Sequence, residues 1–295
     1  MKTAAYKYLP PDLADRLRPF GLTVRRPMEG PRQGQHRSPH HGSSVEFADY
    51  REYTRGDPPN LIDWAVFART DRYVIRRYQE ETSLRSYILL DTSESMDFRD
   101  QGLQTKMGYA CYLAAGLMYI LINQGDSAGL MLFNDTLYRQ FQPAGNLEGL
   151  RPLLLGLEEI KPAGLSDIEG ILHEAAEQLR HRSLVILISD LLQDPAAISR
   201  GLRHLHHNGH EVTVMHVLDP SEIRLQLTGL VELRELETAR KLVLQADEIR
   251  EAYDAEVRRF IERLRRGCID CLAEYHLAET RKPVEEVLHW RVIRA

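Results

Sequence analysis

The sequence predicts an α/β fold: a mostly parallel sheet flanked by helices, preceded by an N-terminal extension. After residue 83, short apolar runs alternate with apolar or amphipathic stretches of ten or more residues. Strands that alternate with helices of this length form βαβ units and a mostly parallel sheet. Before that point, Gly, Pro and Arg are frequent, which predicts loops and short elements. We therefore divide the chain into an extension, 1–83, and an α/β domain, 84–295.

The predicted strands are short apolar runs. Residues 87–90 and 184–188 are apolar throughout, as expected of strands covered on both faces. A strand at 128–133 is expected to pair as a hairpin with 136–141 across Asn134-Asp135. Further strands are expected at 212–218, within 230–244 as two short pieces, and at 271–277.

Helices are predicted between these strands. The stretch 103–123 contains the longest apolar run, 109–122, which is too short to span a bilayer and predicts a buried helix. Residues 247–265 form a charged amphipathic helix. The other helices are expected at 147–157, 168–179, 195–207 and from Pro283 onward.

Composition narrows the classes of function. The chain has 38 Lys and Arg against 43 Asp and Glu, a net charge of −5. This balance gives no general reason to bind nucleic acid or an anionic membrane. The N-terminus has no apolar core like that of a signal peptide, and of the three cysteines at least one stays unpaired. We therefore expect a cytoplasmic protein.

Polar residues follow the apolar runs at three predicted strand-to-helix junctions. Asp91, Ser93 and Ser95 alternate after the first strand, Asp190 follows 184–188, and Ser166 precedes the helix at 168. Ligands of open parallel sheets collect at the carboxyl ends of strands, and oxygen-only ligands suit Mg²⁺, or Mn²⁺ as a second choice. We predict a metal site of these five residues, with Asp91 on an exposed strand end.

Each of these residues also has a simpler explanation. The segment from Asp91 to Ser95 could cap the following helix, because Asp and Ser are favoured N-caps. The pair Ser166-Asp167 could cap the helix that follows it, and Asp190 could be a solvated loop acid. We favour the metal site because the three segments are expected at one edge of one sheet.

The pattern Asp91-x-Ser93-x-Ser95 resembles the metal-ion-dependent adhesion site of von Willebrand factor type A domains. In this resemblance, Ser166 takes the place of the family's Thr and Asp190 that of its distal Asp. The resemblance implies a Rossmann-type, mostly parallel sheet and a metal that binds an acidic group of a partner. Serine keeps the hydroxyl ligand but lacks the methyl group that could fix its rotamer.

A second resemblance rests on blocks outside this site. Phe-Ala-Asp-Tyr-Arg-Glu-Tyr at 47–53, Ile-Asp-Trp at 62–64 and His-Val-Leu-Asp-Pro-x-Glu at 216–222 resemble the bacterial proteins of domain of unknown function 58. Members are similar to partners of MoxR-type AAA+ ATPases, and many carry N-terminal transmembrane helices, which we do not expect here. The resemblance implies binding to a MoxR-type AAA+ ATPase, an acidic client protein or both, during assembly or remodelling of a client complex.

The N-terminal block alternates charged and aromatic side chains. Its candidate partner-binding residues are Glu46, Asp49, Tyr50, Arg51, Tyr53, Asp57, Asp63, Trp64 and Arg69. One interpretation is a salt-bridged, aromatic-anchored segment that closes the edge of the sheet. The other is a docking surface, because Trp, Tyr and Arg are enriched at binding hot spots.

Three functions remain open, and the last of them is a purely structural α/β scaffold with an empty site. The first is a non-enzymatic, metal-dependent adaptor that binds proteins. The alternative is a metal-dependent phosphoryl-transfer hydrolase, because an Asp after a strand can accept phosphate. Haloacid dehalogenase-like phosphatases use a second Asp where this chain has Ser93, and we find no Lys in a matching loop and no Gly-rich phosphate cradle. We therefore predict no enzymatic activity.

Two further spacings are typical of metal sites but carry less weight. Cys268-x-x-Cys271 has no second cysteine pair beside it, so a structural role is expected. The histidines at 204, 206, 207 and 210 lie near a predicted helix end among polar residues, which predicts a solvated surface.

Overall fold

The computed structural model describes residues 6–22, 36–37, 46–54, 57–79, 81–82, 84–234, 241–289 and 292–294. Side chains are described for all of these except 36–37, 46–49, 76–79, 81–82, 231–234, 241–244 and 292–294. The chain forms two compact units. The larger consists of Met1–Thr23 with Arg85–Ala295, and the smaller is Val24–Leu84.

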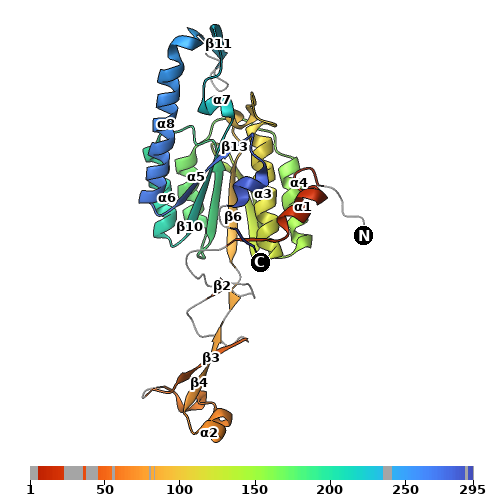
Figure 1. Cartoon of the computed structure of the whole chain (residues 1–295), viewed down its shortest axis with the longest axis vertical. Coiled ribbons are helices and arrows are strands. Elements are labelled where there is room, and N and C mark those ends of the chain that lie inside the picture. The colour runs from red at the N-terminus through yellow and green to blue at the C-terminus, as the bar shows by residue number, and fades with distance from the viewer. Residues whose placement is uncertain are drawn as a thin grey trace. The chain divides into compact units, whose positions relative to one another are not determined.

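The larger unit is built on a six-stranded sheet (Figure 1) with the strand order β13-β10-β9-β6-β7-β8. All neighbouring strands are parallel except β7 and β8. The strands are β6 (Arg85–Asp91), β7 (Ser127–Phe133), β8 (Leu137–Ala144), β9 (Leu184–Ser189), β10 (Glu211–Leu218) and β13 (Glu274–Glu279). The predicted mostly parallel sheet and the predicted hairpin between β7 and β8 are confirmed.

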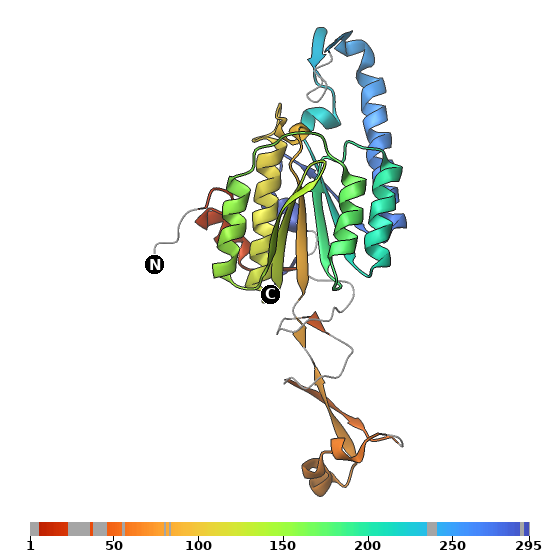
Figure 2. The same ribbon diagram turned by 180° about the vertical axis from the view of Figure 1, so that it is seen from behind.

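Helices cover both faces of this sheet (Figures 1 and 2). One face carries α3 (Lys106–Asn123) and α4 (Leu147–Glu158), and the other carries α5 (Ile168–Gln178) and α6 (Pro195–His207). Side chains alternate across a strand, so Tyr87 and Leu89 of β6 join the buried cluster under α5 and α6. The architecture that the first resemblance implies is therefore present.

The apolar helix α3 is buried along most of its length because it lies between the sheet and other helices. Thr105 caps it by accepting a hydrogen bond from the amide of Gly108 at 3.0 Å. In the part of the chain that the structure describes, no helix combines the length and apolarity needed to cross a membrane.

Two N-terminal elements belong to the larger unit. Helix α1 (Pro11–Leu17) packs against α3, and β1 (Phe20–Leu22) pairs antiparallel with β14 (Val292–Arg294). The observed division therefore differs from the predicted one at 83/84. The reason is that α1 buries Leu13 and Leu17, and seven residues are too few to give a clear helical period in the sequence.

The smaller unit contains two short antiparallel pairs. Strand β3 (Glu46–Glu52) pairs with β4 (Val74–Gln79) in a sheet of its own, and β2 (His36–Arg37) pairs with β5 (Glu81–Thr82). Between β3 and β4 lie a 3₁₀ turn, η1 (Pro59–Leu61), and helix α2 (Trp64–Thr70). The block resembling the second family thus forms a hairpin with an inserted helix.

A projecting arm follows β10. It comprises α7 (Pro220–Ile223), the hairpin of β11 (Leu230–Arg234) and β12 (Lys241–Gln245), and the beginning of α8 (Ala246–Asp270). Both views show β11 and the start of α8 extending beyond the carboxyl ends of the sheet strands. The side chain of Arg250 on α8 donates hydrogen bonds to the carbonyls of Leu225 and Leu227, at 3.1 and 2.8 Å. These bonds fix the connection to α8.

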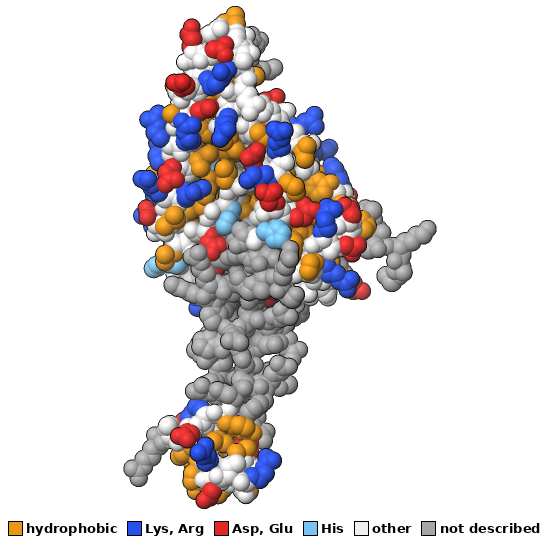
Figure 3. Space-filling view, in the orientation of Figure 1, with side chains coloured by type: hydrophobic (Ala, Val, Ile, Leu, Met, Phe, Trp, Pro, Cys, Tyr) orange, Lys and Arg blue, Asp and Glu red, His pale blue; other side chains and the backbone are white. Residues whose placement is uncertain are grey.

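Helix α8 carries charges of both signs on its exposed side. Arg263 pairs with Glu256 at 3.1 Å and Arg266 with Glu262 at 3.0 Å. Figure 3 shows basic and acidic side chains intermingled over this face of the larger unit.

Candidate metal site

The five predicted ligands meet at one edge of the sheet. Strands β6 and β9 are parallel neighbours, so Asp91 and Asp190 follow strand ends that lie side by side. The loop carrying Ser166 is attached to this edge because the amide of Glu94 donates to the carbonyl of Gly164 at 2.9 Å. Gly164 has φ +75°, a conformation that favours glycine.

Asp91 lies at the centre of the site and is 0% exposed. Its Oδ2 accepts hydrogen bonds from the hydroxyls of Ser189 at 2.6 Å and Ser166 at 3.1 Å. Its Oδ1 accepts one from the amide of Ser93 at 2.9 Å. The prediction that Asp91 lies on an exposed strand end is wrong, because β6 is a central strand and the loops at its end bury the carboxylate.

The electrostatics of Asp91 follow from this burial. Loss of solvent raises the pKa of Asp91 to about 6, and the nearby charge of Asp190 acts in the same direction. Hydrogen bonds from Ser189 and Ser93 lower the pKa but do not offset burial. Among the described residues, its hydrogen-bond donors are hydroxyls and an amide, so no basic side chain compensates this carboxylate directly.

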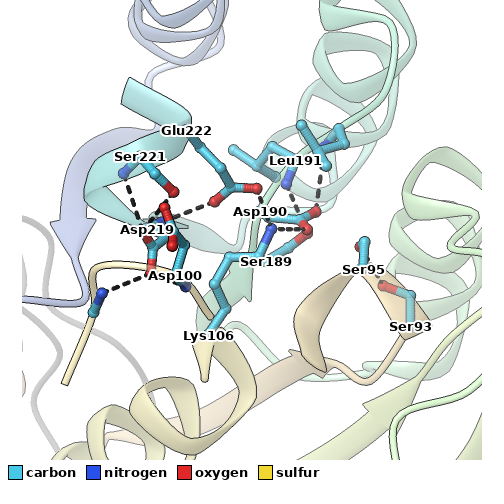
Figure 4. Close-up of polar contacts among 12 residues, drawn as sticks. Ser93, Ser95, Asp100, Lys106, Ser189, Asp190, Leu191, Asp219, Ser221 and Glu222 are labelled. Carbon is cyan, nitrogen blue, oxygen red and sulfur yellow. Dashed lines mark hydrogen bonds and ion pairs between the residues drawn. The ribbon is translucent and has the colours of Figure 1, made fainter. Parts of the chain in front are cut away.

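Ser93 and Ser95 supply two further oxygens. Ser93 stands at the N-cap position of the 3₁₀ turn η2 (Glu94–Asp97), but its side chain makes no capping hydrogen bond. Instead its Oγ lies 3.2 Å from the Oγ of Ser95, and both residues are buried (Figure 4). The capping explanation for this segment therefore does not hold.

The pair Ser166-Asp167 divides two roles between its members. Asp167 caps α5 by accepting a hydrogen bond from the amide of Gly170 at 3.0 Å. Ser166 does not cap and instead contacts Asp91. The side chain of Gln193 donates to the carbonyl of Ser166 and accepts from the amide of Ile168. These two hydrogen bonds join the Ser166 loop to the loop after β9.

Asp190 is neither solvated nor free. It is 2% exposed, and its Oδ2 lies 2.8 Å from the Nζ of Lys106, whose ammonium also lies 2.7 Å from Oε1 of Glu222 (Figure 4). The explanation as a solvated loop acid is wrong. Lys106, the first residue of α3, was missed by the sequence argument. The available signal was that it is the only charged residue in 106–123.

The residues at 216–222, which resemble the second family, support this cluster. Glu222 and Asp219 form a capping box on α7, with Glu222 Oε2 accepting from the amide of Asp219 at 2.8 Å. Asp219 also accepts hydrogen bonds from the backbone amides of residues 100–102. Burial alone would raise the pKa of Asp219, but hydrogen bonds from the amides of Ser221, Gln101 and Asp100 lower it below its usual value. Burial raises the pKa of Glu222.

His216 supports the same loop from below. One ring nitrogen, Nε2, lies 2.8 Å from the carbonyl of Asp190, and the other lies 2.6 Å from the hydroxyl of Tyr275. Burial lowers the pKa of His216 to about 4, so the ring is neutral at neutral pH. A neutral ring that donates from Nε2 and accepts at Nδ1 satisfies both contacts.

The arrangement fits a hard cation better than a soft one. Asp91, Ser93, Ser95 and Ser166 bring oxygens together around a buried carboxylate, and oxygen ligands suit Mg²⁺ or Mn²⁺. In the described part of the chain, no group of three or more His, Cys, Asp or Glu side chains is arranged to hold a metal. Hydroxyls would therefore supply much of the coordination, and Asp190 is engaged by Lys106.

Some of the predicted partner-binding residues of the smaller unit are engaged in contacts within that unit, whereas Trp64 is exposed. Arg51 and Asp57 form a bidentate pair at 2.5 and 2.7 Å, and the Arg51 guanidinium holds the pKa of Asp57 well below its usual range. Asp63 caps α2 and accepts from the hydroxyl of Tyr50 at 3.3 Å. Trp64, by contrast, is 56% exposed.

The other predicted partner-binding residues of the smaller unit make local contacts or have side chains that are not described. Arg69 donates to the carbonyl of Ala65 at 3.1 Å within α2, and Tyr53 lies 6.5 Å from Tyr73 between ring centroids. Glu46 and Asp49 lie in β3, but their side chains fall outside the description.

The Cys and His spacings do not produce a metal site here. Cys268 and Cys271 are buried free thiols, and burial raises the pKa of Cys268 to about 12. The histidines are not uniformly solvated as predicted. His210 is buried, and Nδ1 of His204 lies 2.7 Å from Nδ1 of His173 because α5 and α6 pack side by side.

Comparisons with known proteins agree with the second resemblance. The model of the family described as "Protein of unknown function DUF58" matches residues 49–263. An uncharacterised protein of Mycobacterium tuberculosis is 30% identical over 232 residues, which cover 77% of this chain and 72% of that protein.

Two solved structures are also similar, at lower identity. The conserved hypothetical protein BatB from Bacteroides thetaiotaomicron has a TM-score of 0.47 and 15% identity, covering 70% of this chain and 94% of BatB. The SpRpn10 VWA domain has a TM-score of 0.40 and 13% identity, covering 70% of this chain and 94% of that domain.

Proposed function

The chain belongs to the DUF58 family, and we propose that it is a metal-dependent protein-binding adaptor without enzymatic activity of its own. Mg²⁺, or Mn²⁺, would be held by Asp91, Ser93, Ser95 and Ser166, with the charge of Asp190 nearby. The observation that carries this proposal is the buried Asp91 carboxylate, which receives only hydroxyl and amide hydrogen bonds among the described residues. A cation would offset the desolvation that raises its pKa.

The proposed ligand set favours recognition of an acidic group. A divalent cation held by neutral hydroxyls and few carboxylates keeps positive charge, which a partner's Asp or Glu satisfies with a charge-assisted bond. The chain's own residues hold and orient the cation. Ser189 and Ser166 fix the Asp91 carboxylate from one side, and the amide of Ser93 fixes it from the other.

Exposed apolar side chains next to the site support a protein partner. Leu103, Leu165 and Leu192 are all exposed. Leu165 precedes Ser166, Leu192 lies two residues after Asp190, and Leu103 follows the amides that bind Asp219. Apolar contacts around a polar anchor are typical of protein interfaces. A partner acid flanked by apolar residues would suit this surface.

The partner is proposed from the family resemblance. A MoxR-type AAA+ ATPase, an acidic client or both would bind, and the chain would take part in assembling or remodelling the client complex. The smaller unit offers a second contact surface in its exposed aromatics, Tyr50, Trp64 and Tyr73. Aromatic side chains are enriched among residues that dominate binding energy.

The hydrolase alternative has less support. Ser93 stands where a phosphatase of the haloacid dehalogenase type would have its second Asp. A phosphate-binding enzyme often uses a lysine at its site. The Lys106 side chain could not serve in this way, because it is 1% exposed and is held by two carboxylates. We therefore expect no turnover of generic phosphate esters. Steady, metal-dependent hydrolysis that disappears in Asp91→Asn would overturn this expectation.

Calorimetric titration with Mg²⁺ tests the site itself. The parent should bind Mg²⁺ and Asp91→Asn should not. Asp97→Asn is the matched control, because Asp97 is an exposed aspartate in the same loop and its replacement should leave affinity unchanged. Equal affinity in the parent and Asp91→Asn would rule out this assignment. Capture of the AAA+ ATPase with Mg²⁺ and with chelator then tests the adaptor role.

A further inference from the structure

Lys106 occupies a position that local helix energetics disfavour. It is the first residue of α3, where the helix dipole repels positive charge, and the first turn of α3 contains no acidic residue. Its ammonium is buried, and burial of an uncompensated charge is unfavourable. The side chain must therefore be held by distant groups.

Those groups come from two other loops. Nζ of Lys106 lies 2.8 Å from Oδ2 of Asp190 and 2.7 Å from Oε1 of Glu222, and 5.6 Å from the ring centroid of Phe98. Both carboxylates raise the pKa of Lys106 against the effect of burial. The lysine is thus charged, and its charge is directed at Asp190 and Glu222 rather than at Asp91.

Several contacts engage Asp190 with groups other than Asp91. Its Oδ2 faces Lys106, its Oδ1 accepts from the amide of Leu192 at 3.4 Å, and its carbonyl contacts His216. The next residue, Leu191, has φ 53°, a left-handed conformation that is unfavourable for leucine. This turn allows the amide of Leu191 to donate to Oγ of Ser189 at 3.0 Å. Ser189, not Asp190, then contacts Asp91.

We propose that Lys106 is a positioning residue that keeps the Asp190 carboxylate from binding the cation directly. This inference rests on the proposed metal site. With Asp190 engaged, the cation meets one carboxylate, Asp91, and neutral hydroxyls. It therefore keeps more positive charge for the partner's acidic group. Lys106 sets the balance between holding the metal tightly and presenting it to a partner.

The proposal predicts that replacing Lys106 raises the affinity for Mg²⁺. Removing a positive charge from a purely structural pair would lower stability and leave the Mg²⁺ site as it was. If Lys106 restrains Asp190, its removal frees a second carboxylate beside the cation. Mg²⁺ affinity should then rise, by about tenfold if one carboxylate oxygen is added to the ligand set.

The test is calorimetric titration of the full chain with Mg²⁺ alone. Lys106→Met should bind Mg²⁺ about tenfold more tightly than the parent. The double variant Lys106→Met with Glu222→Gln removes one charge of each sign, so the net charge of the cluster is that of the parent and folding is protected. It should also bind more tightly. Glu222→Gln alone, which leaves Lys106 on Asp190, should not.

The outcomes separate this inference from the proposed function. Thermal unfolding with and without Mg²⁺ confirms that each variant is folded. If the parent binds no Mg²⁺, the proposed site and this inference both fail. If the parent binds but Lys106→Met and the double variant bind equally or more weakly, the site stands and the role of Lys106 is overturned.

Discussion

Two ion pairs in this chain have similar geometry but very different surroundings. Lys106 and Asp190, in the larger unit, are 2.8 Å apart with side chains 1% and 3% exposed. Arg51 and Asp57, in the smaller unit, are 2.5 Å apart with side chains 27% and 18% exposed. Water and salt screen the second pair but hardly reach the first. Similar distances therefore do not imply similar energies.

The aspartates of the two units also differ in whether a partner group compensates their charge or caps a helix with them. In the smaller unit, Asp57 is bound by Arg51 and Thr54, and Asp63 caps a helix. In the larger unit, Asp91 is buried without a basic partner among the described residues. The difference assigns the proposed cation to the larger unit. It leaves the exposed aromatic side chains as the proposed contact surface of the smaller unit.

The largest expected effect follows from breaking the buried pair. In chelator, Lys106→Met should lower the free energy of unfolding by about 3–5 kcal/mol, because it leaves buried carboxylates uncompensated. Denaturant unfolding measures this loss, and added Mg²⁺ should restore part of it. The matched variant in the smaller unit, Arg51→Met, should shift the unfolding midpoint far less. Similar shifts in both variants would contradict the comparison.

The next effect concerns Asp91 and pH. Its pKa of about 6 in the folded state lies above the unfolded value, so the folded state binds the proton more tightly. The penalty is therefore fully present above about pH 6 and is relieved as pH falls toward 4. Without metal, Asp91→Asn should be more stable than the parent at pH 7 by on the order of 3 kcal/mol.

The measurement is the free energy of unfolding of both proteins from pH 4 to pH 8 in chelator. The difference between them should shrink to near zero at the acid end of this range. A difference that is constant with pH would show that Asp91 is not the titrating group. Mg²⁺ should stabilise the parent at pH 7 and lose its effect at low pH, because protons compete for the same carboxylate.

Part of this site could be predicted from the sequence, and part could not. The spacing of apolar residues and the ends of apolar runs are local properties of the sequence. The sheet, the hairpin and the place of Asp91-x-Ser93-x-Ser95 at the end of a strand could therefore be predicted. The partner of Lys106 could not, because Asp190 lies 84 residues away in the chain. Ser189 directly follows the predicted strand 184–188, and its hydrogen bond to Asp91 spans 98 residues.

Burial was the other property that the sequence did not reveal. Asp91 and Asp190 follow apolar strands, and polar residues at strand ends are often exposed. Here the loops at 92–97, 163–166 and 189–193 fold over the strand ends and tie to one another, as the bonds of Glu94 and Gln193 show. Such closure depends on contacts between three loops. No single segment contains the information.

A smaller effect is expected from the hydroxyl ligands. Ser93→Ala removes one proposed oxygen but keeps the amide that donates to Asp91 Oδ1. Mg²⁺ affinity should fall by about tenfold, or roughly 1.4 kcal/mol. Ser221→Ala is a matched control, since that hydroxyl serves Asp219 in the supporting capping box. If both serine variants bind Mg²⁺ like the parent, hydroxyl coordination at Ser93 is excluded.

The smallest effect on stability, and the sharpest test of the comparison, is expected at Trp64. Its ring is exposed and lies 6.0 Å from Phe67 between centroids, so Trp64→Ala removes little buried surface. The unfolding midpoint and Mg²⁺ affinity should therefore stay at the parent values. Capture of the AAA+ ATPase should weaken, because an exposed aromatic that serves neither core nor cap is free to contact a partner. Leu61→Ala, an exposed apolar residue in the neighbouring turn, controls for general loss of apolar surface. If capture falls in Asp91→Asn but not in Trp64→Ala, the partner binds through the metal site alone; if it falls only in Trp64→Ala, the smaller unit carries recognition.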